Sequence, residues 1–231
     1  MHNNIIKWME ILLKERLSNE LNLKFKNEQL FLTANGCLGS IIFDELQKNF
    51  LKFKSNINCS KWDPKSEGLF SISKIPLFAP TSIPLKPVII EKKRENYFIH
   101  YDIFGLAYWT LNRVEEIENN NLDRFKRFNF KHSHAFNYKY LDHPIIDYWF
   151  DILSQVVKKL WPKINLRKSK FTINLSHDVD RPFIQYCGKN FHSYLRNIGS
   201  QFVHANKREY KKILQTYLGT YKKNVLHDPY N

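Results

Sequence analysis

The segment 171–175 most strongly constrains the fold, because it has the pattern of a strand that leads directly into two carboxylates. Its odd-numbered residues are apolar and its even-numbered residues are polar, which is the period-2 pattern of a half-buried strand. Pro182 has no backbone N–H to donate and prevents the strand from continuing. Asp178 and Asp180 are therefore expected at the carboxyl end of a strand, where α/β folds bind ligands.

The two aspartates are separated by one residue, so in an extended chain both side chains point to the same side. Two carboxylates on one side suit a divalent cation, a proton transfer, or both. An Asp-x-Asp triplet by itself is a weak motif. In the alternative interpretation, Asp178 caps the following turn and His177 is an ordinary strand-end histidine that bonds to the backbone.

The complete string Ser176-His-Asp-Val-Asp-Arg-Pro182 resembles the first motif of the NodB-like polysaccharide deacetylases, carbohydrate esterase family 4. This resemblance implies that Asp178 is the catalytic base that activates water and that Asp180 is a metal ligand. Three upstream stretches resemble the domain that precedes the deacetylase domain in some bacterial proteins of surface-polysaccharide gene clusters. They are residues 101–116, 123–127 and 141–146.

The sequence departs from that family at the metal site. The deacetylases complete the site with a His-x-x-x-His pair downstream of the aspartates, and no two histidines of this chain have that spacing. His132 and His134 are two residues apart and precede the aspartates. In an intact relative, the resemblance implies a divalent metal, zinc first, held by Asp180 and two later histidines. For this chain alone we expect weak or no metal binding and no deacetylation.

We expect a mixed α/β chain with two parts. Residues 1–165 form an N-terminal accessory domain, and residues 166–231 form the first strand and helices of an incomplete (β/α) deacetylase-type barrel. The last residues resemble a mid-domain stretch of longer relatives, so we expect a truncated second domain.

Apolar stripes predict three helices. They cover residues 3–18, a stretch that begins after Asp102 as its cap and continues through Glu115 and Glu116, and residues 144–161. Hairpin-like pairs are predicted over 31–43 and 88–101. Residues 52–87 include five prolines, and we predict a long surface connection there.

Residues 123–134 interleave four basic residues with three phenylalanines. Such a segment can stack bases or sugars while it contacts phosphates. It can equally form a strand whose phenylalanines are partly buried, and we favour the strand.

The formal net charge is +14, and the excess is concentrated near the C-terminus, where residues 181–231 contain nine Lys or Arg against two acidic residues. Such a field attracts nucleic acid, an anionic membrane surface, nucleotide-sugar phosphates or an acidic glycan. Within it, residues 207–217 have the pattern of an amphipathic helix. A solvated basic face ranks first for this helix, a membrane surface second, and nucleic acid last.

The remaining composition indicates a globular protein without a membrane span. No apolar run approaches the ~18 residues that a span requires, and we expect a cytoplasmic protein, with a position peripheral to the inner membrane as the alternative. Three cysteines at wide spacing predict free thiols rather than a disulfide framework. No Gly-rich phosphate loop or Gly-x-Ser-x-Gly elbow supports a nucleotide-triphosphatase or a serine hydrolase.

The sequence thus predicts the N-terminal part of a deacetylase-like hydrolase that acts on an N-acetylated sugar. Two alternatives stay open. One is a metal-dependent, glycosyltransferase-like Asp-x-Asp protein, in which the carboxylates hold a metal on the diphosphate of a nucleotide sugar. The other is a non-enzymatic basic module that docks on a membrane or on a biosynthetic complex.

Overall fold

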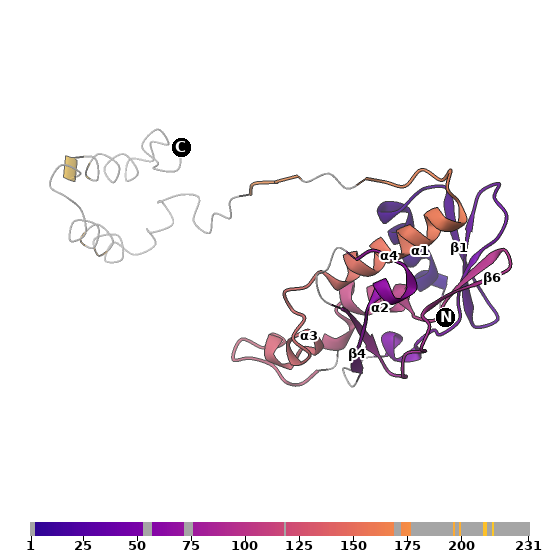
Figure 1. Cartoon of the computed structure of the whole chain (residues 1–231). Helices are drawn as coiled ribbons and strands as arrows, with labels where there is room; N and C mark the ends of the chain where they lie inside the picture. The colour runs from indigo at the N-terminus through magenta and orange to yellow at the C-terminus, as the bar shows by residue number, and fades with distance from the viewer. Residues whose placement is uncertain are drawn as a thin grey trace. The chain divides into compact units, whose positions relative to one another are not determined.

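The computed structural model describes residues 3–52, 57–71, 76–117, 119–168 and 172–176, together with Arg196, Gly199, Tyr210, Lys211 and Leu214. The chain divides into two compact units, Met1–Ser169 and Lys170–Asn231. The helices and strands named below all belong to the first unit (Figure 1). In the expected helix 207–217, only Tyr210, Lys211 and Leu214 are described, and their backbone is helical.

A five-stranded sheet organises the first unit, and its strands follow the order β1-β2-β3-β7-β6. Neighbouring strands are antiparallel except β3 and β7, which are parallel and place Phe43 beside Ile99. The strands are β1 (Leu21–Lys26), β2 (Gln29–Ala34), β3 (Ile41–Phe43), β6 (Ile90–Lys93) and β7 (Asn96–Ile99).

Both predicted pairs are confirmed, because β2 pairs with β3 and β6 pairs with β7. Strand β1 was missed by the sequence analysis. It forms a hairpin with β2 through Asn27 and Glu28, which both have positive φ values of 49° and 59°. Glutamate is an uncommon residue at such a turn position, so the local sequence carries no strong signal for this hairpin.

Three longer helices pack against the sheet and against one another (Figure 1). Large apolar side chains join the layers: the Phe104 ring meets Phe43 and Phe150 edge to face, with ring centroids 5.3 and 5.8 Å apart. The structure confirms the three predicted helices, which are α1 (Asn3–Arg16), α2 (Ile103–Leu111) and α4 (Ile145–Leu160).

Helix α2 is shorter than predicted, because it ends at Leu111 instead of continuing through Glu115 and Glu116. Arg113 adopts a left-handed conformation with φ of 53°, which interrupts the helical backbone. The two glutamates belong to a separate 3-10 turn, Val114–Glu116. Three further short helices are Lys48–Leu51, Phe130–His132 and α3 (His134–Asn137).

The prediction of an irregular connection over residues 52–87 is wrong. The segment contains β4 (Asn58–Trp62) and β5 (Leu77–Thr81), which form a two-stranded antiparallel sheet, with the 3-10 helix Pro64–Glu67 between them. Every residue of β5 is buried. Pro80 is tolerated in β5 because this strand pairs on one side only. The Trp149 indole of α4 donates a 2.9 Å hydrogen bond to the Phe78 carbonyl and stacks on Trp62.

The expected strand at 171–175 is not formed over its described residues. Residues 172–176 have no regular secondary structure, and Ile173 and Leu175 are 67% and 87% exposed. A strand needs a neighbour for its backbone hydrogen bonds and a covered face for its apolar side chains. The described elements form a mixed α/β structure without a closed barrel, and the boundary at 165 stays a prediction.

The favoured strand at 123–134 is also wrong. One isolated antiparallel bridge joins Leu122 to Phe128, and the residues between them form a tight turn. Phe125 and Phe130 are 59% and 54% exposed, so the segment lacks the covered face that a half-buried strand requires.

Asp102 caps α2 as predicted and is fully buried. Its carboxylate accepts hydrogen bonds from the Gly105 N–H at 2.7 Å and from the Gln47 N–H at 2.9 Å. Burial raises the pKa of Asp102 to about 6, and the two backbone hydrogen bonds partly oppose that shift. A Cβ atom at position 105 would collide with the Asp102 carboxylate, which explains the glycine in the first turn of α2.

We expect Gly105→Ala to destabilise the protein by about 1 to 3 kcal/mol, the usual cost of overpacking a core site. In an Asp102→Ala background the same substitution should cost much less, because the carboxylate is gone and alanine favours a helix over glycine by about 1 kcal/mol. Urea denaturation of the wild type, both single variants and the double variant measures this coupling. Additive losses in the double variant would contradict the assigned collision.

We expect a protease of broad specificity to cut first within residues 172–176, because this described segment is exposed and irregular. The product should be a folded fragment that contains α1 through α4. Mass spectrometry of the fragments and a melting curve of the purified product test this. Early cuts within β1, β2 or α1 would show that the first unit is not the stable part.

Candidate functional site

The two aspartates predicted to carry the chemistry, Asp178 and Asp180, lie outside the described residues, as does His177. Ser176 is the last described residue before them. Their roles as base and metal ligand therefore stay predictions. The described part of the first unit contains three other groups of polar or charged residues, and each defines a different kind of site.

A charged cluster lies where the parallel strands β3 and β7 end. The register pairs Phe43 with Ile99, so the next residues, Asp44 and His100, lie side by side at the carboxyl ends of the two strands. In α/β proteins, ligand sites are commonly built from polar residues at this edge of the sheet. We call this the His100 cluster, and its members are Asp44, Glu45, Lys86, Glu91 and His100.

His100 is held between two carboxylates. Its Nδ1 atom lies 2.6 Å from Asp44 Oδ1, and its Nε2 atom lies 3.4 Å from Glu91 Oε2. The imidazole is 6% exposed. Lys86 approaches the same edge, 2.8 Å from Glu45 Oε1 and 3.7 Å from Asp44 Oδ2. The Glu45 carboxylate, and to a smaller extent Asp44, raises the pKa of Lys86.

The geometry of the His100 cluster suits ion pairing more than metal binding. Asp44 and Glu91 approach opposite nitrogens of one ring, so their oxygens do not converge on a common point with it. Among the described residues, no group of three or more His, Cys, Asp or Glu side chains is placed to hold a metal ion. A neighbouring cavity of about 360 Å³ is lined by Asp44, Gln47 and Lys48, among others.

The second group is built around His134, which is 2% exposed. Its Nε2 atom lies 2.8 Å from the Ile57 carbonyl and its Nδ1 atom lies 2.6 Å from the Tyr140 hydroxyl. A neutral imidazole satisfies both contacts, with Nε2–H donating and Nδ1 accepting from Tyr140. Burial lowers the pKa of His134 and raises that of Tyr140, so both stay uncharged. Both ring nitrogens are occupied, which leaves no lone pair for a metal.

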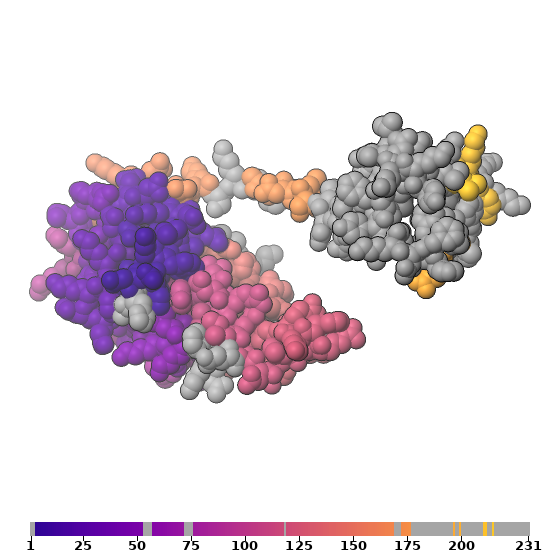
Figure 2. Space-filling model, turned by 180° about the vertical axis from the view of Figure 1, so that it is seen from behind, coloured from indigo at the N-terminus to yellow at the C-terminus, as the bar shows by residue number. Residues whose placement is uncertain are grey.

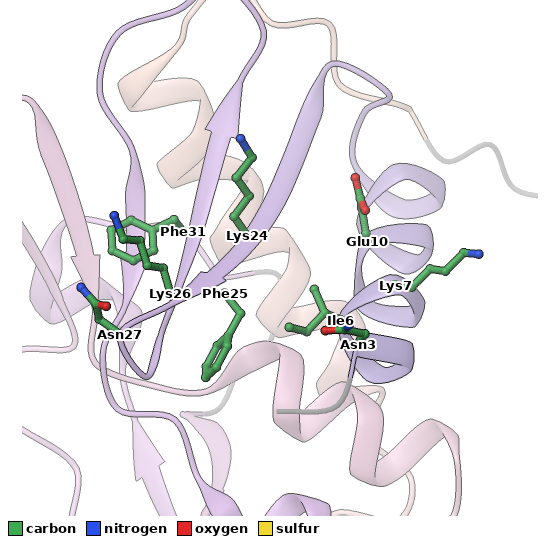
Figure 3. A pocket seen from close by; sticks show the side chains of 9 residues that line it. All are labelled: Asn3, Ile6, Lys7, Glu10, Lys24, Phe25, Lys26, Asn27 and Phe31. Carbon is green, nitrogen blue, oxygen red and sulfur yellow. The ribbon is translucent and has the colours of Figure 1, made fainter.

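The third group lines an open groove of about 770 Å³ between α1 and the β1–β2 hairpin. Ile6 on the helix faces the hairpin strand that carries Phe25, whereas Lys7 points away from the hairpin (Figure 3). Lys24 and Lys26 are exposed and form no ion pair with another described residue. The groove is therefore basic, but its lysines also protect the edge strand β1 from pairing with another chain.

Sequence reasoning missed the His100 cluster, because Asp44 and His100 are 56 residues apart. Each does follow an apolar strand directly, which is the signal available in the sequence. Their contact depends on the parallel register of β3 and β7, and the hairpin patterns predicted only antiparallel neighbours.

The first unit is a mixed α/β domain whose parallel strand pair ends in a charged cluster. Residues 3–162 match the family of unknown function DUF7033, so the chain belongs to that family. No curated protein and no solved structure matches the chain. Within the described part of the chain, no helix has the length and apolar character needed to cross a membrane.

His134 predicts a pH dependence of stability. Because its pKa is lower in the folded protein than in the unfolded chain, its neutral form contributes fully above about pH 6.5, and stability is lost as the pH falls through that value toward the folded pKa. The slope should reach up to about 1.4 kcal/mol per pH unit for one proton. His134→Gln should flatten the slope, since an amide can replace both hydrogen bonds without titrating.

Denaturant melts between about pH 5.5 and 7.5, the range around an ordinary histidine pKa, measure the slope. His132→Gln is the matched control, because it removes an exposed histidine from the same segment. An unchanged slope in His134→Gln, or an equal change in both variants, would contradict the assignment.

Proposed function

We propose that this chain contains the N-terminal accessory domain of a polysaccharide deacetylase-like hydrolase, followed by the opening of its catalytic domain. The observation that supports this most directly is the string Ser176-His-Asp-Val-Asp-Arg-Pro182, which begins shortly after the family match ends at residue 162. The accessory domain corresponds to the first unit, and the proposed chemistry belongs to Asp178 and Asp180.

The donors in this sequence do not complete a zinc site. Zinc in hydrolytic sites takes three protein ligands and keeps one open position, and a deacetylase of this kind needs the His-x-x-x-His pair that these 231 residues lack. His134 is committed to Tyr140 and the Ile57 carbonyl. We therefore expect this chain alone to release no acetate.

In a relative with the histidine pair, Asp180 and the two histidines would hold a divalent metal, which would supply Lewis-acid polarisation of the acetamide carbonyl. Asp178 would accept a proton from the water that attacks the carbonyl carbon, and that proton would pass to the amide nitrogen as the C–N bond breaks. The products are acetate and a free amino sugar. Asp180 would be a metal ligand and Asp178 the base, so the two aspartates would have separable roles.

The test is a chain lengthened with the downstream segment of a NodB-like deacetylase that carries the histidine pair. It should bind zinc in a calorimetric titration and release acetate from an oligosaccharide of N-acetylglucosamine. Asp180→Ala should abolish zinc binding. Asp178→Asn should retain zinc but lower turnover by about 10² to 10⁴-fold, because an amide cannot accept the proton.

Glu209→Gln is the control, because it removes an acidic group outside the motif. Unchanged zinc affinity in Asp180→Ala would reject the metal assignment, and lost zinc with surviving turnover in Asp178→Asn would mean that the two roles are exchanged. Thermal protection by a nucleotide sugar and a metal, without acetate release, would favour the glycosyltransferase-like alternative.

A further inference from the structure

Residues 122–141 expose an unusual number of large apolar side chains. Figure 2 shows this part of the first unit, in pink, as a projection from the purple body of that unit. We call it the aromatic–basic projection. Its exposed apolar side chains are Leu122 (48%), Phe125 (59%), Phe130 (54%), Phe136 (43%), Tyr138 (37%) and Leu141 (57%). Clustered exposure of this kind marks an interaction surface more often than scattered single residues do.

The projection is also strongly basic. Its single acidic residue, Asp123, forms an ion pair of 2.9 Å with Arg127. The basic residues are Arg124, Lys126, Arg127, Lys131 and Lys139. A partner that covers the projection must therefore offer anionic groups as well as an apolar environment.

The tip of the projection is a fixed turn. Asp123 Oδ1 accepts hydrogen bonds from the backbone N–H groups of Phe125 and Arg127 at 2.8 and 3.0 Å. These bonds, together with the Arg127 guanidinium, lower the pKa of Asp123. Phe125 lies at the tip, and the guanidinium groups of Arg124 and Arg127 lie 4.6 and 4.9 Å from its ring centroid. The turn thus presents one aromatic ring together with two guanidinium groups.

The base of the projection is anchored in the core. The buried His134 and Tyr140 bond to each other, and Glu115 accepts a 2.9 Å hydrogen bond from the His134 N–H. In the same part of the chain, the Phe130 and Phe136 rings meet edge to face, with centroids 5.4 Å apart. The exposed rings therefore belong to a segment that buried hydrogen bonds fix to the core.

We propose that the aromatic–basic projection docks the protein on an anionic membrane surface. Leu122 and Leu141 favour a lipid surface over nucleic acid or a glycan, because aliphatic side chains gain by leaving water but do not stack on bases or sugars as aromatic rings do. A bilayer offers both required chemistries together, with acyl chains for the apolar side chains and lipid phosphates for the cations. Phe125 already has guanidinium groups over its ring, which leaves less of its face for stacking.

This inference is independent of the proposed catalytic function, because docking needs neither Asp178 nor Asp180. It also differs from the sequence-based expectation that the basic residues 181–231 meet a membrane. Within the described residues, the basic groove between α1 and the hairpin is a weaker candidate, since its apolar residues Ile6, Phe25 and Phe31 are only partly exposed.

The test is flotation of the full chain with vesicles of phosphatidylcholine alone or mixed with phosphatidylglycerol, without substrate or metal. We expect binding to the mixed vesicles only, weakening as salt is raised. Arg124→Gln with Lys126→Gln should weaken binding about 25-fold, since one basic residue near such a surface is worth about a factor of five. Phe125→Ala with Phe130→Ala should weaken it by at least about tenfold.

Matched controls exist elsewhere on the first unit. Lys92→Gln with Arg94→Gln removes the same two charges from exposed positions outside the projection. Leu38→Ala with Phe70→Ala removes side chains that are 82% and 69% exposed. Both control variants should bind like the wild type. The Arg124 and Lys126 variant changes only exposed polar groups, so it decides the outcome if the phenylalanine variant melts early.

Three results would overturn the proposal. They are an absence of vesicle binding, vesicle binding that the projection variants leave unchanged, and equal losses in the projection and control variants. Binding to an acidic polysaccharide or to nucleic acid, without vesicle binding, would assign the projection to a different partner. None of these results bears on acetate release, so failure of the docking proposal is distinguishable from failure of the proposed function.

Discussion

The buried carboxylate of Asp102 is the interaction on which the first unit most depends. It caps α2 at the Gly105 N–H and also accepts from the Gln47 N–H, so one side chain joins the helix to the segment after β3. The Gln47 side chain in turn accepts from the Ser82 N–H at 2.7 Å, just beyond β5. Burial of this charge is costly, and the two N–H donors offset part of that cost.

The parallel pairing of β3 with β7 brings together two residues that are far apart in the sequence. It places Asp44 and His100 at a common sheet edge, where Lys86 pairs with Glu45 and Lys93 pairs with Glu91. His134 is buried without any carboxylate on its ring and stays neutral between a hydroxyl and a carbonyl. The two imidazoles therefore differ in their partners, which are carboxylates for His100 and a hydroxyl and a carbonyl for His134.

In the aromatic–basic projection, one set of residues is buried in the core and another set is exposed to solvent. His134 and Tyr140 belong to the core, whereas Phe125, Phe130 and Leu141 remain more than half exposed. A surface that keeps large apolar side chains in water loses the stabilisation that burying them would bring. Docking on a partner would recover that stabilisation. These exposures therefore agree with a projection that a partner covers in the functioning protein.

The sequence by itself determined the features that depend on local periodicity and capping. The stripes of α1 and α4, the Asp102 cap and the paired strands β2–β3 and β6–β7 all follow from residues close together in the chain, and Asp178 and Asp180 are candidates from their motif alone. Only the tertiary structure decided the β4–β5 sheet in a proline-rich segment, the irregular backbone at 172–176 and the contact of Asp44 with His100. These depend on which distant segment accepts a backbone hydrogen bond or covers an apolar face, and no local pattern specifies that partner.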